Sequence, residues 1–198
     1  TTLTAAGIFD VFIVQYAPDG TLLWARSAGG SDSDYGSGIT VDAAGNAVVT
    51  GQFIGTATFG AGEANETTLT AAGYGDIFVA QYAPDGTLRW ARSAGGGDYD
   101  GGNGVAVDAA GNALVTGGFE YSATFGAGEA NETTLTGSGF DIFVAKYAGA
   151  PSSEQPDLTV NRIRAPRMLR PGKAVTVRVT IGNEGDADVT GTYAVSLF

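Results

Sequence analysis

Apolar and polar residues alternate in short runs along the chain, and the clearest pair of runs flanks a tight turn. Residues 38–42 (GITVD) and 46–53 (NAVVTGQF) alternate apolar with small or polar residues on either side of the sequence AAGN. Alternation with a period of two is typical of a half-buried strand. The sequence therefore predicts a β-hairpin over these residues.

A second pair of runs has the same character. Residues 76–83 (DIFVAQYA) and 87–93 (TLRWARS) flank PDG, in which Pro84 presets φ and Gly86 can adopt a positive φ. Two hairpins make one four-stranded antiparallel sheet, and residues 56–73 between them hold two weaker extended pieces around a glycine-rich loop. No segment shows the 3.6-residue period of an amphipathic helix, so the chain is predicted to be all-β.

The pattern recurs because the sequence itself recurs. Aligned without a gap, residues 1–66 and 67–132 are identical at 49 of 66 positions. A third, incomplete copy begins at Thr133 with TTLTGSGFDIFVAKYA and is one residue shorter before Asp141. A repeated unit that cannot bury its own faces is expected to stack on copies of itself.

Four-stranded antiparallel units repeated without helices predict the blades of a β-propeller. A parallel β-helix is the alternative, and it fits less well because its coils are usually shorter than this repeat and lack paired tight turns. A propeller ring needs about four to eight blades, and residues 1–147 supply about two and a half. We therefore expect either further blades in a longer chain or self-association.

Three strings within the repeat carry a resemblance to a known family. D-x-F-V-A-x-Y, G-x-L-x-W-A and V-D-x-x-G-N-x-x-V-T-G recur in this order. Over residues 1–147 the chain resembles the bacterial β-propeller repeat family called SBBP. The resemblance implies a propeller on a secreted or surface-attached bacterial protein, and it does not imply a catalytic site.

The residue pattern changes after the repeats. Residues 148–156, with the string SSEQP, are predicted to form a linker, and residues 157–198 alternate in strand fashion with turns at PGK and GNEGDA. The opening PDL, the strand PGKAVTVRVTI and the N-E-G turn are similar to the start of a CARDB-like module, which implies an immunoglobulin-like β-sandwich on a bacterial surface protein. About half of such a sandwich is present, since the whole fold needs ~100 residues.

Composition and charge exclude several kinds of site. The chain has no cysteine and no histidine, which excludes disulfides, Cys/His zinc sites and a histidine general base. Residues 1–147 carry 16 acidic and 4 basic side chains, and such a surface repels the phosphate backbone of a nucleic acid. No run of about 18 apolar residues occurs, so no membrane-spanning helix is expected.

The loops between repeats contain the most suggestive polar pattern. They read GGSDSDYGSG at 29–38 and GGGDYDGGNG at 95–104, and Asp32, Asp34, Asp98 and Asp100 hold equivalent places in the two copies. Carboxylates two residues apart in a glycine-rich loop can direct oxygens at one Ca²⁺, which prefers oxygen ligands. The alternative is a solvated Asx-turn loop, which a short D-x-D motif fits better than a calcium site.

The aromatic residues of the predicted strands have two interpretations. Trp24, Trp90, Tyr16, Tyr82 and Phe78 could form a sugar-stacking platform. Aromatic side chains that alternate within strands more often pack between blades, so we expect these residues in the core.

Repetition without a singular chemical constellation favours a non-enzymatic function. We expect an extracellular adhesion, binding or spacer module of a bacterial protein, with a cell-surface glycan or protein as its partner. One alternative is a carbohydrate-active enzyme that uses acidic residues such as Asp98 and Asp100 on a propeller, although glycosidases place two carboxyls across a bound sugar. The other is a purely structural stalk without a ligand.

Overall fold

A computed structural model describes residues 2–149, 158–164, 175–183 and 191–197, with side chains described up to residue 149. The chain divides into two compact units, Thr1–Ala150 and Pro151–Phe198. The elements in the described residues are all strands, which confirms the all-β prediction. Those of the first unit are β1 (Val11–Tyr16), β2 (Leu22–Ala28), β3 (Tyr35–Val41), β4 (Ala47–Phe53), β5 (Thr56–Phe59), β6 (Thr67–Thr70), β7 (Asp76–Tyr82), β8 (Leu88–Ala94), β9 (Gly101–Val107), β10 (Ala113–Phe125) and β11 (Thr133–Tyr147).

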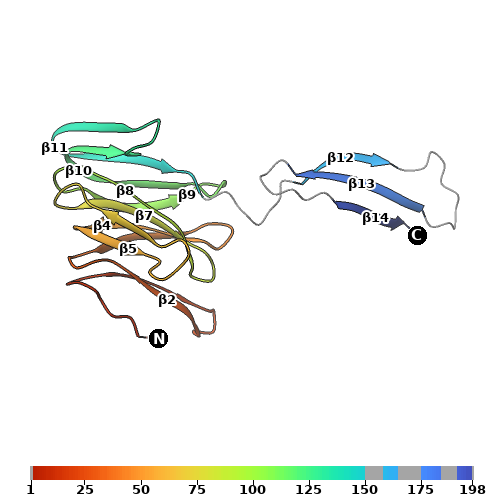
Figure 1. Cartoon of the computed structure of the whole chain (residues 1–198), viewed down its shortest axis with the longest axis horizontal. Helices are drawn as coiled ribbons and strands as arrows, with labels where there is room; N and C mark the ends of the chain where they lie inside the picture. The colour runs from red at the N-terminus through yellow and green to blue at the C-terminus, as the bar shows by residue number, and fades with distance from the viewer. Residues whose placement is uncertain (1, 150–157, 165–174, 184–190, 198) are drawn as a thin grey trace. The chain divides into compact units, whose positions relative to one another are not determined.

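These strands form three successive antiparallel sheets and one small hairpin. Sheet 1 is β1-β2, sheet 2 is β3-β4-β7-β8 and sheet 3 is β9-β10-β11, while β5 and β6 pair with each other. Figure 1 shows them in layers, from β2 at one end of the unit through β4 and β7 to β10 and β11 at the other. None of the sheets closes into a barrel or ring within the described residues.

Sheet 2 contains both hairpins predicted from the alternation. β3 pairs with β4 and β7 pairs with β8, and the two hairpins join through the β4–β7 pairing. Gly45 and Gly86 adopt φ values of +84° and +83° in the two connecting turns. Such values are disfavoured for side chains with a Cβ, so these glycines set the turn geometry.

The repeat in sequence is a repeat in structure. β1 and β2 are the counterparts of β7 and β8, and β9 is the counterpart of β3. In sheet 3 the counterparts of β4 and β5 merge into β10, and those of β6 and β7 merge into β11. A bulge between Glu120 and Ser122 marks the join in β10, where Tyr121 has a φ of +60°. The strand bends at this bulge but its pairing with β11 continues.

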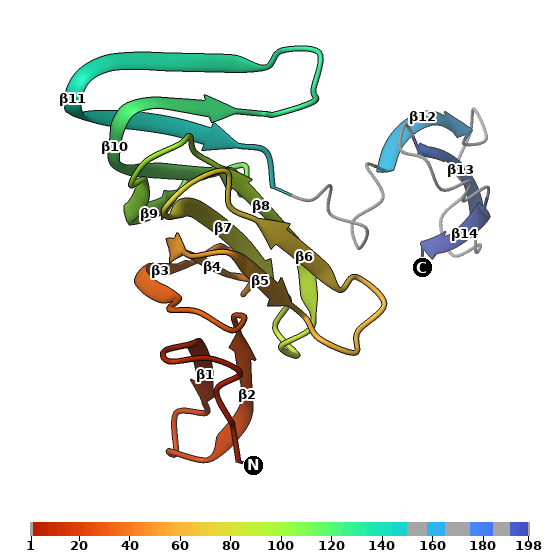
Figure 2. The ribbon, with the colours of Figure 1, turned by 60° about the vertical axis from the view of Figure 1, so that its left-hand side comes forward.

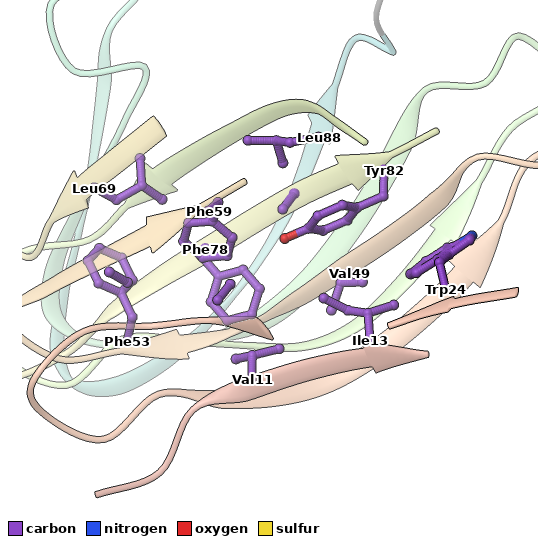
Figure 3. Close-up of a cluster of buried hydrophobic side chains, with 13 residues drawn as sticks. Val11, Ile13, Trp24, Val49, Phe53, Phe59, Leu69, Phe78, Tyr82 and Leu88 are labelled. Carbon is purple, nitrogen blue, oxygen red and sulfur yellow. The ribbon is translucent and has the colours of Figure 1, made fainter. Parts of the chain in front are cut away.

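The core lies between the sheets, because both faces of β7 are buried. Phe78 and Tyr82 point from β7 toward sheet 1 and pack in a cluster with Val11, Ile13 and Trp24 (Figure 3). The alternate side chains of β7 belong to a second cluster, together with side chains of β10 and β11 from sheet 3. Sheet 2 is therefore packed between its two neighbours, as alternation along a strand requires.

The two end faces of the stack have no such cover within the first unit. Figure 2 shows β1 and β2 at one end and the long β10–β11 hairpin at the other. Phe12 on β1 is 71% exposed, whereas its counterpart Phe78 is 0% exposed. Ile142 and Val144 on β11 are 83% and 76% exposed. Equivalent strands are thus buried on both faces in the middle copy and exposed on one face at each end of the stack.

The second unit is a sheet of its own. Strands β12 (Leu158–Arg164), β13 (Val175–Asn183) and β14 (Gly191–Leu197) pair antiparallel in the order β12-β13-β14. Most of the linker predicted at 148–156 lies outside the described residues, as do the turn PGK and most of the turn GNEGDA, whose first two residues end β13. The CARDB-like assignment of residues 157–198 remains a prediction.

Candidate functional site

Asp34 and Asp100 lie in the two loops that lead from one sheet to the next, residues 29–34 and 95–100, which we call the crossings. The Asp34 carboxylate accepts hydrogen bonds from the backbone N–H of Gly30 (2.8 Å) and of Ile54 (3.2 Å). Asp100 does the same with Gly96 (2.6 Å) and Glu120 (3.1 Å). Both carboxylates are buried. Each therefore joins the start of a crossing to the end of β4 or to its counterpart in β10.

Glycine is required at the start of each crossing because the chains approach closely there. A Cβ placed on Gly30 would lie 1.7 Å from the carbonyl oxygen of Thr56, and one on Gly96 would lie 2.0 Å from that of Ser122. Next to these glycines, Gly29 pairs with Thr58 through two backbone hydrogen bonds of 3.2 and 2.9 Å. The GG pair of each loop thus fastens one sheet to the small hairpin region of the next.

Asp32 and Asp98 occupy a different environment from their neighbours in the D-x-D motif. Asp32 is exposed and Asp98 is half-buried. No group of three or more carboxyl side chains within the described part of the chain is arranged to hold a metal ion. The calcium site at Asp32, Asp34, Asp98 and Asp100 remains a prediction, and two of its four carboxylates already bind backbone N–H groups.

A third buried carboxyl, Asp76, stands at the beginning of β7. Burial raises the pKa of Asp76 from its ordinary value of 3.8 to about 6, and the nearby charge of Asp100 adds to the rise. Burial also raises the pKa of Asp34 and of Asp100. Asp76 accepts a hydrogen bond from the N–H of Ala72 (3.1 Å), while its Oδ1 has no protein partner. Asp76 is therefore costly to ionise, chiefly because it is buried and to a smaller extent because of the charge of Asp100.

Asp76 makes the stability of the chain depend on pH. Because the folded-state pKa of Asp76 is the higher one, its favourable contribution is full below about pH 4 and is lost as the pH rises toward 6. We expect the free energy of unfolding of Asp76→Asn to rise by roughly 2–3 kcal/mol relative to that of the wild-type chain between pH 4 and pH 7. Urea unfolding at both pH values measures this. Val79→Ala, on the same strand and without a titratable group, should show the same change in the free energy of unfolding with pH as the wild type.

The tight turns of successive sheets gather at one end of the unit. The turns after β3 and β7 lie together, because Gln81 Nε2 donates to Asp42 Oδ2 (3.3 Å). The turn after β7 also contacts sheet 1, since Trp24 Nε1 donates to the carbonyl oxygen of Pro84 (2.9 Å). We call this surface the turn face: residues 17–21, 42–46, 83–87 and 108–112. It presents the sequences APDGT and DAAGN twice each.

Aspartate carboxylates stabilise the turn face by accepting hydrogen bonds from backbone N–H groups of their own turns. The Asp42 carboxylate accepts hydrogen bonds from the N–H of Ala44 (3.0 Å) and of Asn46 (2.8 Å). Asp108 repeats this pattern, and hydrogen bonds from Lys146 and Asn112 hold the pKa of Asp108 well below its usual range. These are Asx turns, which explains why DAAGN begins with Asp and ends with Asn.

Most aromatic residues of the strands lie in the core, as expected. Trp24, Tyr82 and Phe78 are buried, and Trp90 is half-buried and stacks on Tyr147 at a centroid distance of 6.5 Å. The expectation was wrong for Tyr16, which is exposed because no sheet covers the outer face of β1 within the first unit. The buried aromatics are not placed to form a sugar-stacking platform.

Sequence reasoning missed a hollow of about 320 Å³ beside the free edge of β11. Its lining includes Gly126, Glu129, Asn131, Ala145 and Tyr147. Burial raises the pKa of the Tyr147 hydroxyl to about 12, and this hydroxyl has no protein partner. The sequence did contain one indication of this hollow: the hexapeptide AGEANE, which contains Glu129 and Asn131, is unchanged between the first two copies.

Comparison with known proteins adds no family to this picture. Neither a family model nor a curated protein sequence matches the chain. Within the part that the structure describes, no helix has the length and apolar character needed to cross a bilayer.

Proposed function

We propose that residues 1–147 form part of a β-propeller scaffold, and that this scaffold is a non-enzymatic binding or spacing module. The observation that carries the proposal is that the same acidic side chains are used in both copies to hold backbone. Asp34 and Asp100 fasten the crossings, and Asp42 and Asp108 fasten the turns. A stack of equivalent units, each supported in the same way, is typical of repeat scaffolds.

The arrangement of the sheets supports the propeller part of this proposal. Sheets 1 to 3 follow one another in sequence and pack on each other through clusters of apolar side chains. The first strands of sheets 2 and 3 approach at Gly38 and Gly104, where a Cβ on Gly38 would lie 3.2 Å from the Cα of Gly104. The blades of a propeller surround a central channel, and such an approach of equivalent strands is what we expect beside it.

The turn face is the surface that we propose for binding. It presents the same short sequences at regular intervals, so a polymeric ligand with repeating units could engage several turns at once, which raises avidity without a deep pocket. The SBBP resemblance supports a secreted or surface-attached bacterial location, and it suggests a cell-surface glycan or protein as the ligand. The Asp98 and Asp100 pair gives weak support to hydrolysis, because Asp100 is buried and bound to backbone N–H groups.

Sedimentation with insoluble polymers tests the proposal. The full chain is mixed with cellulose, chitin or purified peptidoglycan, and bound protein and released reducing sugar are measured in the same tubes. We expect retention on at least one polymer without sugar release, and a several-fold loss of retention in the double variant Asp19→Ala/Asp85→Ala. These two side chains are exposed, in equivalent turns.

The same tubes separate the alternatives. Sugar release would support the carbohydrate-active enzyme and contradict a non-enzymatic module. Retention that the double variant does not change would place binding outside these turns. No retention on any polymer would leave the spacer form of the scaffold.

A further inference from the structure

Two side chains outside sheet 2 hold its last strand, β8, at one residue. Glu63 Oε2 accepts the N–H of Leu88 at 2.6 Å, and Asn65 Nδ2 donates to the carbonyl oxygen of the same residue at 3.2 Å. Leu88 is 2% exposed and fits against Gly60, where a Cβ would lie 2.7 Å from the Leu88 Cβ. Glu63, Asn65 and Gly60 thus form a receptor for a strand, which we call the strand clamp.

Sheet 3 carries the same clamp without a strand in it. Glu129, Asn131 and Gly126 are the counterparts of the three clamp residues, and all three line the hollow beside β11. β11 pairs with β10 along one edge, and no strand of the described residues pairs with its other edge. The hollow is therefore the place that β8 fills in sheet 2.

Sheet 1 complements sheet 3, because its two strands, β1 and β2, are the counterparts of β7 and β8, the third and fourth strands of sheet 2. β2 reads LLWARSA and β8 reads LRWARSA, so the two strands differ at one residue. Leu22, the counterpart of Leu88, is 39% exposed in sheet 1. β2 therefore has the side chains that fit a strand clamp and lies in a sheet that offers it none among the described residues.

The remaining strand of sheet 1, β1, is a near copy of the end of β11. Residues 10–17 read DVFIVQYA and residues 141–148 read DIFVAKYA. Val11 and Ile13 are buried against sheet 2, whereas their counterparts Ile142 and Val144 are exposed. The exposed face of β11 thus matches the face that β1 buries.

We propose that copies of this chain join head to tail through one composite sheet, made of β9, β10 and β11 from one copy and β2 from the next. β11 displaces β1 of the second copy, Ile142 and Val144 take the places of Val11 and Ile13, and Leu22 enters the clamp of Glu129 and Asn131. The β7–β8 register places Ala145 opposite Ala25, as Ala80 lies opposite Ala91. This is a heterologous exchange of equivalent strands between two different surfaces of the chain, and it rests on the proposed propeller but not on the proposed ligand.

The number of copies in the assembly follows from the number of blades in a closed propeller. Each copy contributes sheet 2 and one composite sheet, so two to four copies supply the four to eight blades of a closed propeller. Light scattering and native mass spectrometry of the full chain should give a defined mass of two to four times 20.0 kDa that falls to 20.0 kDa on dilution. A chain that stays at 20.0 kDa at several hundred micromolar would overturn the proposal.

Point variants test which surface is used. Val144→Asp should abolish the assembly, because that side chain is exposed in the single copy and buried in the composite sheet. Glu129→Ala/Asn131→Ala should weaken it about tenfold or more through the loss of a charge-assisted and a neutral hydrogen bond. Thr136→Asp is the matched control, since Thr136 and its counterpart Thr70 are both exposed. Assembly that survives Val144→Asp would overturn the proposal.

Engineered cysteines test the register, because the chain has none of its own. Chains carrying Ala145→Cys and Ala25→Cys, mixed and oxidised, should form a disulfide-linked heterodimer in high yield. Ala145→Cys mixed with Thr21→Cys, which lies outside the predicted pairing, should not. Equal yields from the two mixtures would overturn the proposed pairing of β11 with β2.

Discussion

Phe78→Ala is expected to lower the free energy of unfolding by about 3–5 kcal/mol, the range found when a buried phenylalanine ring is removed from a core. The Phe78 side chain is fully buried between sheets 1 and 2, with its ring centroid 5.1 Å from that of Phe59. Its loss would leave a cavity in the cluster that joins the two sheets. Chemical denaturation followed by tryptophan fluorescence measures the change.

The repeat supplies a matched control for this variant. Phe12 is the same residue type at the equivalent position of β1, and it is 71% exposed. Phe12→Ala should change the free energy of unfolding by less than about 0.5 kcal/mol. Equal losses from the two substitutions would contradict the layered arrangement, because they would require cover on the outer face of β1.

Asp100→Ala is expected to lower the free energy of unfolding by about 2–4 kcal/mol, and Asp98→Ala by less than about 0.5 kcal/mol. The first substitution leaves the part-buried N–H groups of Gly96 and Glu120 without their acceptor. The relief of repulsion between Asp100 and Asp76 offsets part of this loss. Thermal and urea unfolding of the two variants beside the wild type give the comparison.

The same variants decide between a structural carboxylate and a calcium site. If Asp100 serves only the backbone, its substitution has the same effect in excess Ca²⁺ and in chelator. A calcium site built from both D-x-D carboxylates would instead stabilise the wild-type chain by roughly 2.7 kcal/mol at 100 times the dissociation constant. That gain would then be lost in Asp98→Ala as well as in Asp100→Ala.

Local features of the sequence were sufficient to predict the strands and their hairpins. The alternation over 46–53 and 76–83, with Gly45 and Gly86 in the connecting turns, corresponds to β4, β7 and the pairings found in sheet 2. These features are local because a strand period and a positive φ depend on neighbours in sequence. The repeat identity likewise predicted that equivalent strands would recur in sheets 1 and 3.

The candidate site was predicted only as a set of positions. Asp98 and Asp100 look alike in the sequence, yet Asp98 is half-buried, whereas Asp100 is buried and accepts two hydrogen bonds from backbone N–H groups. The donors on Asp100 come from residues 96 and 120, and the second of these is brought near only by the packing of the crossing on β10. Sequence spacing therefore could not separate the two roles.

The sequence by itself determined the all-β class, the hairpins and the repeat, since each follows from period and turn chemistry within a few residues. Only the tertiary structure decided which copies of a residue are buried. Phe12 and Phe78 stand in closely similar local sequences, and Glu63 and Glu129 in identical ones. Burial depends on what packs against the strand, and the sheet on either side of a copy is supplied by the next copy, so identical sequence has different surroundings in the middle of the stack and at its ends.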